Sequence, residues 1–209
     1  MKRTYEHLAR ICRLPAPIKN TSEGYGAVAR WFHWSTAATF IAAYLLVYAA
    51  IWIATREHPN YLSLLRGHVA LGLLVGILTV PRLLWRFVGI KPRELPGSPV
   101  GHILARVTHA SLYLFMLLMP LTGYLGTNKG FDLWLFHFPG FGSSSMFSWL
   151  SSTYGFDWQS FEEPIDAIHH FLGKRVIWVV VALHATAALY HHFVLHDRTL
   201  RRMWPDDKP

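Results

Sequence analysis

Residues 165–195 read IDAIHHFLGKRVIWVVVALHATAALYHHFVL. This stretch decides the fold, because it is apolar over more than the roughly 20 residues that a helix needs to cross a bilayer. It also carries histidines, among them His169, His170 and His184. A titratable group is costly in hydrocarbon, so histidines in such a segment indicate a functional site. The alternative for any one of them is a hydrogen bond to a neighbouring helix.

Three further apolar blocks run over Trp31–Ala54, Leu64–Val88 and His102–Leu125. Of the 209 residues, 52% are hydrophobic and 15% are charged, whereas a soluble domain carries about 25% charged residues. We therefore predict an all-α membrane protein, a bundle of four transmembrane helices. Its predicted parts are an N-terminal segment (1–29), a transmembrane domain (30–197) with an aromatic-rich connection (126–164), and a basic tail (198–209).

The formal charge of +8 would suggest nucleic acid in a soluble protein, but here membrane topology explains it. Four crossings place 15 of the 20 cations on the side of the termini. The positive-inside rule then predicts a multi-pass membrane protein with cytoplasmic N and C termini. Its partner is the lipid bilayer, and no nucleic acid is expected. The five cations on the outer side are Arg56, Arg66, Lys129, Lys174 and Arg175.

Two segments outside the apolar blocks can also be interpreted. The N-terminal segment is expected at the surface, with a short helix at Tyr5–Cys12. The 126–164 connection is rich in aromatic residues, which settle at membrane–water interfaces. It can form a cap over the outer ends of the helices or an amphipathic surface helix, and both alternatives stay open.

The histidines pair by depth when the helices are packed antiparallel. His33 and His184 fall near the cytoplasmic side, whereas His68 and either His170 or His169 fall near the outer side. Imidazole ligates haem iron in a water-poor interior. Two pairs at two depths are what two bis-histidine haems require, so the bundle is predicted to enclose two haems. The only cysteine is Cys12 and no C-x-x-C-H motif exists, so the haems would be b-type.

Helical geometry favours one of the two adjacent histidines. In an uninterrupted helix, the 14 residues from His170 to His184 rise about 21 Å and leave the side chains about 40° apart. The corresponding offset for His169 is about 60°, so we choose His170. Gly67 and Gly72 flank His68 and would let a flat ring approach the backbone. Close helix packing is the alternative explanation for each glycine.

Other polar residues are candidates for quinone and for the haem carboxylates. His109 and His191 lie near the cytoplasmic side, where they can bind a quinone head group or simply hydrogen-bond a helix end. Arg82 and Arg86 can pair with haem propionates, because guanidinium binds carboxylate bidentately. Ordinary anchoring by the positive-inside rule explains them equally well. Arg66 is a propionate partner or an anion guide on the outer side.

At these residues the chain resembles the bacterial cytochrome b561 family of four-helix, di-haem membrane proteins. The matching stretches are ARWFHW at 29–34, RGHVALG at 66–72, LARVTHASLYLFMLLMPLTGYL at 104–125 and VALHATAALYHHFVLHDRTLRRMWP at 181–205. The resemblance implies haem ligands at His33, His68, His184 and the first ligand histidine of the last helix. There the family pattern H-x-x-L-[AG] fits His169, whereas its 14-residue count fits His170. A π-bulge would reconcile the two.

The resemblance implies an electron carrier that exchanges electrons with ubiquinone. Its sharpest form is an oxidoreductase of the superoxide oxidase kind, which takes electrons from superoxide at the outer face. The alternative is a haem-binding anchor that relays electrons from a partner respiratory dehydrogenase or hydrogenase. A third class, a haem-free proton or solute pathway lined by histidines, would be separated by an absorbance spectrum.

Overall fold

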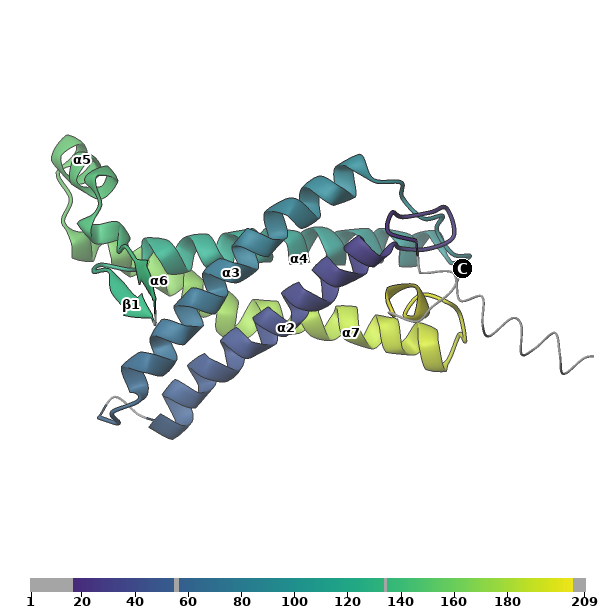
Figure 1. Cartoon of the computed structure of the whole chain (residues 1–209), viewed down its shortest axis with the longest axis horizontal. Helices are drawn as coiled ribbons and strands as arrows, with labels where there is room; N and C mark the ends of the chain where they lie inside the picture. The colour runs from purple at the N-terminus through teal and green to yellow at the C-terminus, as the bar shows by residue number, and fades with distance from the viewer. Residues whose placement is uncertain (1–16, 55–56, 134, 205–209) are drawn as a thin grey trace, which may run out of the picture.

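The four apolar blocks form four long helical rods in the computed structural model, which describes residues 17–54, 57–133 and 135–204 (Figure 1). The first rod is α2 (Ala27–Ala49) continued by the π-helical turn η1 (Ala50–Ala54), and the next two are α3 (Tyr61–Val88) and α4 (Pro99–Leu125). The fourth consists of α6 (Trp158–Phe171), the π-helical turn η3 (Leu172–Val176) and α7 (Ile177–Phe193). The shorter elements are β1 (Phe131–Leu133), β2 (Phe136–Phe138), η2 (Phe141–Ser143), α5 (Ser145–Tyr154) and η4 (Arg201–Met203).

The rods present apolar side chains outward, as a membrane protein does. All four are long and apolar enough to span a bilayer. Large aliphatic side chains such as Leu45, Leu84 and Val179 are at least 60% exposed. A soluble protein rarely leaves contiguous apolar surface of this extent uncovered. The predicted all-α, four-helix membrane fold is confirmed.

The buried positions between the rods are small or hydroxylated. Thr36, Thr79 and Thr122 are buried, and each hydroxyl donates to a backbone carbonyl one turn earlier in its own helix. These bonds satisfy the hydroxyl hydrogens within each helix. At the contact of α3 with α4, a Cβ on Gly76 would lie 3.1 Å from the Cβ of Pro120. A larger residue would therefore push these two helices apart.

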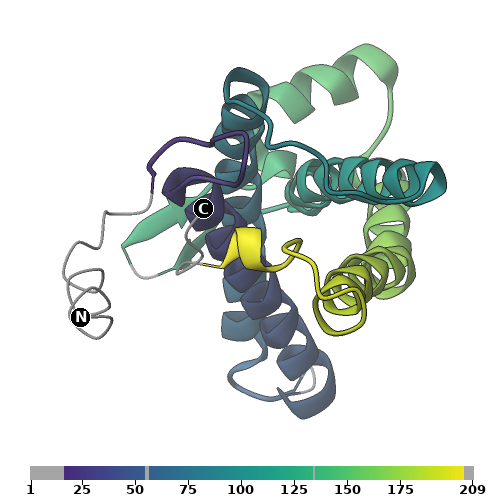
Figure 2. The ribbon, with the colours of Figure 1, turned by 90° about the vertical axis from the view of Figure 1, so that its right-hand side faces the viewer.

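The rods form two layers, visible along the bundle in Figure 2, with α2 and α3 in one and α4, α6 and α7 in the other. Helix α3 packs on both α2 and α4, and α4 packs on α6 and α7. Helix α2 reaches α7 through large side chains: the indole N–H of Trp178 donates to the Tyr48 hydroxyl at 2.9 Å, and the rings of Trp178 and Tyr44 lie 4.8 Å apart between centroids. Away from these side chains, the interior between the two layers is an open cavity.

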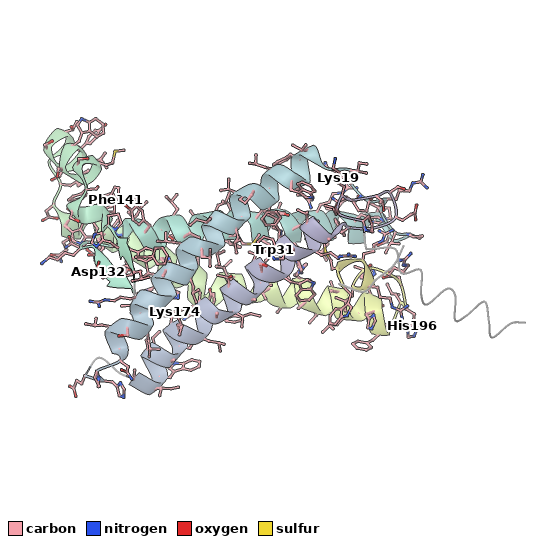
Figure 3. All side chains as sticks on the ribbon, in the orientation of Figure 1. Lys19, Trp31, Asp132, Phe141, Lys174 and His196 are labelled. Carbon is pink, nitrogen blue, oxygen red and sulfur yellow. The ribbon has the colours of Figure 1, made fainter. Side chains whose placement is uncertain are left out.

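The two ends of the bundle differ. The tail end carries residues 17–26, 89–98 and 195–204, so both ends of the described chain lie there (Figure 1). The hairpin end carries β1 and β2, which pair antiparallel with Phe131 opposite Phe138. Figure 3 shows Asp132 and Phe141 at the hairpin end and Lys19 and His196 at the tail end. The helix predicted at Tyr5–Cys12 lies outside the described residues.

The aromatic connection combines features of both predicted alternatives. Phe141 of η2 lies 6.1 Å from Tyr124 of α4 between ring centroids, so this part covers the end of a transmembrane helix. Helix α5 is the predicted surface helix, and it projects sideways from the bundle (Figure 1). A cluster of aromatic rings joins the two parts, with Phe147 of α5 edge-to-face with Phe161 of α6 at 5.4 Å between centroids.

Candidate functional site

Two histidine pairs face each other across the interior. The ring centroids of His33 on α2 and His184 on α7 are 6.2 Å apart. Those of His68 on α3 and His169 on α6 are 6.3 Å apart. Each pair joins a helix of one layer to a helix of the other. The predicted pairing by depth is therefore the arrangement that the structure has, with His169 in place of His170.

Both spacings suit a metal ion held between two imidazoles. A bond from metal to imidazole nitrogen is about 2 Å, and the nitrogen lies about 1 Å from its ring centre, so two opposed ligands have centroids about 6 Å apart. Both pairs meet this value. Among the described residues, no group of three or more His, Cys, Asp and Glu is arranged to bind a bare metal ion. The arrangement suits a group that supplies its own equatorial ligands, as haem does.

One partly open cavity of about 1330 Å³ connects the two pairs and is lined by all four histidines. This exceeds the roughly 300–1,000 Å³ of a usual small-molecule pocket. Its length follows from the rod that carries His169 and His184, since 15 residues rise about 22 Å in an α-helix and slightly less where a π-turn intervenes. A cavity of this size and length can take two flat groups at two depths.

Hydrogen bonds at the hairpin-end pair leave the ring nitrogens that would bind iron free. Nδ1 of His68 donates to the carbonyl of Ala43 at 2.8 Å, because a carbonyl can only accept. Nδ1 of His169 lies 3.0 Å from the Thr122 hydroxyl, whose own hydrogen goes to Leu118. In both histidines the proton sits on Nδ1, and Nε2 keeps its lone pair. This is the usual outer-shell support of a metal-bound histidine.

The tail-end pair is arranged differently. Nη2 of Arg82 donates to Nδ1 of His33 at 3.0 Å, because guanidinium is always a donor. The neutral ring of His33 then carries its proton on Nε2. To bind iron through Nε2, His33 must carry its proton on Nδ1 instead. Arg82 therefore has to move away from Nδ1. Arg82 and Arg86 both lie 5.4 Å from the ring of Tyr113, so the two guanidinium groups share one wall of the cavity.

The expectation of an uninterrupted last helix is wrong, because η3 inserts a π-helical turn over Leu172–Val176. The extra residue turns His169 toward His68. His170 also borders the cavity, but its side chain is 56% exposed and lies 3.7 Å from Asp166. The π-turn frees the carbonyl of Gly173, which accepts a hydrogen bond from the Tyr44 hydroxyl at 3.0 Å.

Three glycines near the hairpin-end pair have different tasks. A Cβ on Gly72 would meet nothing within 4 Å, and this residue lines the cavity one turn from His68. Gly72 therefore leaves room beside the ligand for a flat ring. A Cβ on Gly67 would lie 2.7 Å from Leu46, so this glycine serves helix packing. A Cβ on Gly123 would lie 3.1 Å from the His169 ring, so the absence of a side chain at Gly123 leaves space for that ring.

The remaining candidates divide between the two ends. His109 lies 5.2 Å from His184 between centroids and lines the cavity at the tail end. His191 also lines it and donates from Nδ1 to the carboxylate of Asp197. Arg66 is exposed and is absent from the residues that line the described cavity. Its position fits an anion guide better than a propionate partner.

Asp197 is a residue that the sequence analysis did not select. Burial opposes ionisation of its carboxyl, but hydrogen bonds from His191 and from the Thr199 backbone outweigh this and hold the Asp197 pKa below its usual value. Thr122 was also missed. The signals were present. Asp197 belongs to the matching stretch at 181–205, and Thr122 precedes Gly123 within an apolar segment. Neither signal identifies a partner without the fold.

Comparison with known proteins identifies the family of the chain. The family model described as prokaryotic cytochrome b561 matches residues 24–206. "Cytochrome b561 homolog 2" of Escherichia coli K12 is 31% identical over 190 residues, which cover 88% of this chain and 93% of that protein. "Probable superoxide oxidase CybB" of Yersinia pestis is 27% identical over 182 residues, covering 87% and 96%. The chain therefore belongs to the prokaryotic cytochrome b561 family.

Proposed function

We propose that this membrane b-type cytochrome moves electrons across the bilayer through two haems, one held by His68 and His169 and the other by His33 and His184. The observation that carries the proposal is the pair of equal spacings, 6.2 and 6.3 Å, across one cavity. Haem b, when bound, supplies the one-electron redox centre. The protein supplies the ligands, their separation and the surrounding charge.

The proposed orientation in the membrane follows from the charge distribution. The tail end carries most of the cations, which supports its placement in the cytoplasm of a bacterial inner-membrane protein. The hairpin end, with Lys129, then faces outward. Arg82 and Arg86 at the cytoplasmic side would pair with propionates, which would also release His33 from Arg82.

The quinone site in this proposal lies at the tail end, beside His184. His109 borders that ligand, and the pair of His191 and Asp197 lines the same part of the cavity. Ubiquinone needs two protons with its two electrons. His191, held by Asp197, is placed to pass a proton between the cytoplasm and a bound head group.

The electron donor in the sharpest form of the proposal is superoxide, as the name of the Yersinia relative supports. Two superoxide anions each lose one electron and leave as O2, and one ubiquinone takes both electrons and two protons to become ubiquinol. Exposed cations Arg66, Lys174 and Arg175 would attract the anion. The nearby acidic side chains of α6 oppose this attraction, so the net electrostatic attraction of superoxide would be modest.

The test uses the purified full chain in liposomes that contain ubiquinone. Superoxide generated outside should yield ubiquinol, detected by its absorbance, and superoxide dismutase should abolish the signal. Failure with superoxide, combined with quinone reduction only when a partner dehydrogenase or hydrogenase is added, would instead assign the chain as an electron-relay subunit. A preparation without a haem absorbance band would overturn both.

A further inference from the structure

Exposed apolar side chains surround the hairpin end on two sides. On α5, Met146, Trp149 and Tyr154 are 58%, 57% and 67% exposed. At the turn between β1 and β2, Leu135 and Phe136 are 97% and 69% exposed. We call these five residues the apolar rim. The electron-transfer proposal uses none of them.

The rim belongs to an uncharged segment. Residues 133–156 contain no Asp, Glu, Lys or Arg, although charged residues flank them at Asp132 and Asp157. The segment therefore offers no charge complementarity to a protein partner. Tryptophan and tyrosine with uncharged neighbours are typical of the interfacial zone of a bilayer, where a ring is half in lipid and half in water.

The two parts of the rim point in different directions. Helix α5 and the hairpin extend to different sides of the bundle in the end view of Figure 2. A protein docked on one face would cover one part and leave the other in water. Lipid surrounds a membrane protein on every side, so a bilayer covers both.

The level of the rim also fits a bilayer surface. The segment is tied at one end to the transmembrane helix α4, which ends at Leu125, and at the other to the rod that begins at Trp158. Figure 1 shows α5 at the hairpin end of the bundle, near the start of α6 and on the other side of that end from the tips of α2 and α3. A side group at this level that extends away from the bundle must lie over the surrounding lipid.

Helix α5 is a rigid platform for its exposed side chains. Ser144 caps its first turn by accepting from the Phe147 amide at 3.1 Å, and Gly155 ends it with a φ of +73°. Phe147 is buried against Trp158 and Phe161. Three of its four serine hydroxyls donate to backbone carbonyls: Ser148 to Ser144, Ser151 to Phe156 and Ser152 to Trp149. These bonds satisfy those three hydroxyls without water, which suits a helix that rests in the interface.

We propose that the apolar rim inserts into the outer interfacial zone of the phospholipid bilayer, with α5 as a surface helix and the hairpin turn as a second contact on a different side. The occupant is the uncharged boundary between head groups and acyl chains, because the segment has no cation to select an anionic lipid. The rim would fix the height and tilt of the bundle at its outer end.

The experiment measures the depth of nitroxide labels in the full chain, reconstituted in phosphatidylcholine liposomes. Cys12, the single cysteine, is replaced by serine, and one label is attached at Trp149→Cys, Met146→Cys or Leu135→Cys. The matched control is Lys129→Cys, an exposed position on the turn before β1. Collisions with O2, which concentrates in lipid, are compared with collisions with a water-soluble nickel chelate. Circular dichroism and monodisperse elution show that each variant is folded.

The proposal predicts that the ratio of O2 to nickel collisions at 146, 149 and 135 is severalfold higher than at 129. Ratios at the three rim positions equal to that at 129 would overturn it. Shielding from both reagents in native membranes, with free access to nickel in liposomes, would also overturn it and assign the rim to a protein partner. These outcomes do not depend on haem or on electron transfer.

Discussion

A histidine binds a metal through a ring nitrogen that carries no proton. The hydrogen bond at the other ring nitrogen therefore decides whether the side chain is ready to bind a metal. His68 and His169 are ready, since Ala43 and Thr122 hold the proton on Nδ1. His33 is not, since Arg82 occupies Nδ1 as a donor. In the proposed arrangement, the haem site at the hairpin end is therefore formed in advance, and the site at the tail end requires Arg82 to move.

Substitution of Gly72 tests the room beside His68. Gly72→Leu should remove about one haem and leave the helix content unchanged, because the added side chain enters the open cavity. The matched control Gly76→Leu should instead destabilise the protein by about 1–3 kcal/mol, because its side chain meets Pro120. Haem content and thermal unfolding are measured for both. A full haem complement in Gly72→Leu would show that the porphyrin lies elsewhere.

Asp197 should make the stability of the tail end depend on pH. The folded-state pKa of Asp197 is depressed, so its contribution is fully present above the unfolded pKa of about 3.9 and is lost as pH falls through the lower folded value. The unfolding temperature of Asp197→Asn should therefore lie below that of the parent at pH 6. The two should converge at the lowest pH. A difference that persists unchanged in acid would show that the carboxylate charge contributes nothing.

At the scale of the elements, the last rod could be predicted in part. Hydropathy located it, since residues 165–195 were expected and α6 to α7 span Trp158–Phe193. The π-turn η3 could not be derived from hydropathy, because one inserted residue leaves an apolar pattern apolar. Only the conflict between the motif around His169 and the count to His184 pointed to it. The geometry of an ideal helix favoured His170 instead.

Deletion of Lys174 tests the π-turn directly. A π-turn is one extra residue in an α-helix, so its removal restores a straight helix with His169 and His184 still on one face. Their separation becomes 14 residues, with an offset of about 40°. The deletion should keep both haems. It would leave 13 residues between His170 and His184, so loss of one haem from the deletion variant would favour His170 as the ligand.

At the scale of the whole molecule, alternation of four spans predicted which histidines share a depth. His33 meets His184 and His68 meets the last helix for that reason. The hairpin, the sideways direction of α5 and the proton positions on the rings were beyond the sequence. Each depends on a contact between distant segments, such as the rings of Phe147 and Phe161 or the carbonyl of Ala43 beside His68.

The central claim, two haems held between two pairs of histidines, is tested most directly by the ratio of haem to protein with a reduced-minus-oxidised spectrum. The account predicts two haems in the parent chain and about one fewer in His33→Ala, His68→Ala, His169→Ala and His184→Ala. His170→Ala, the matched control beside a ligand, should keep both. Two haems in all four ligand variants would contradict the account, as would loss of a haem in His170→Ala with none lost in His169→Ala.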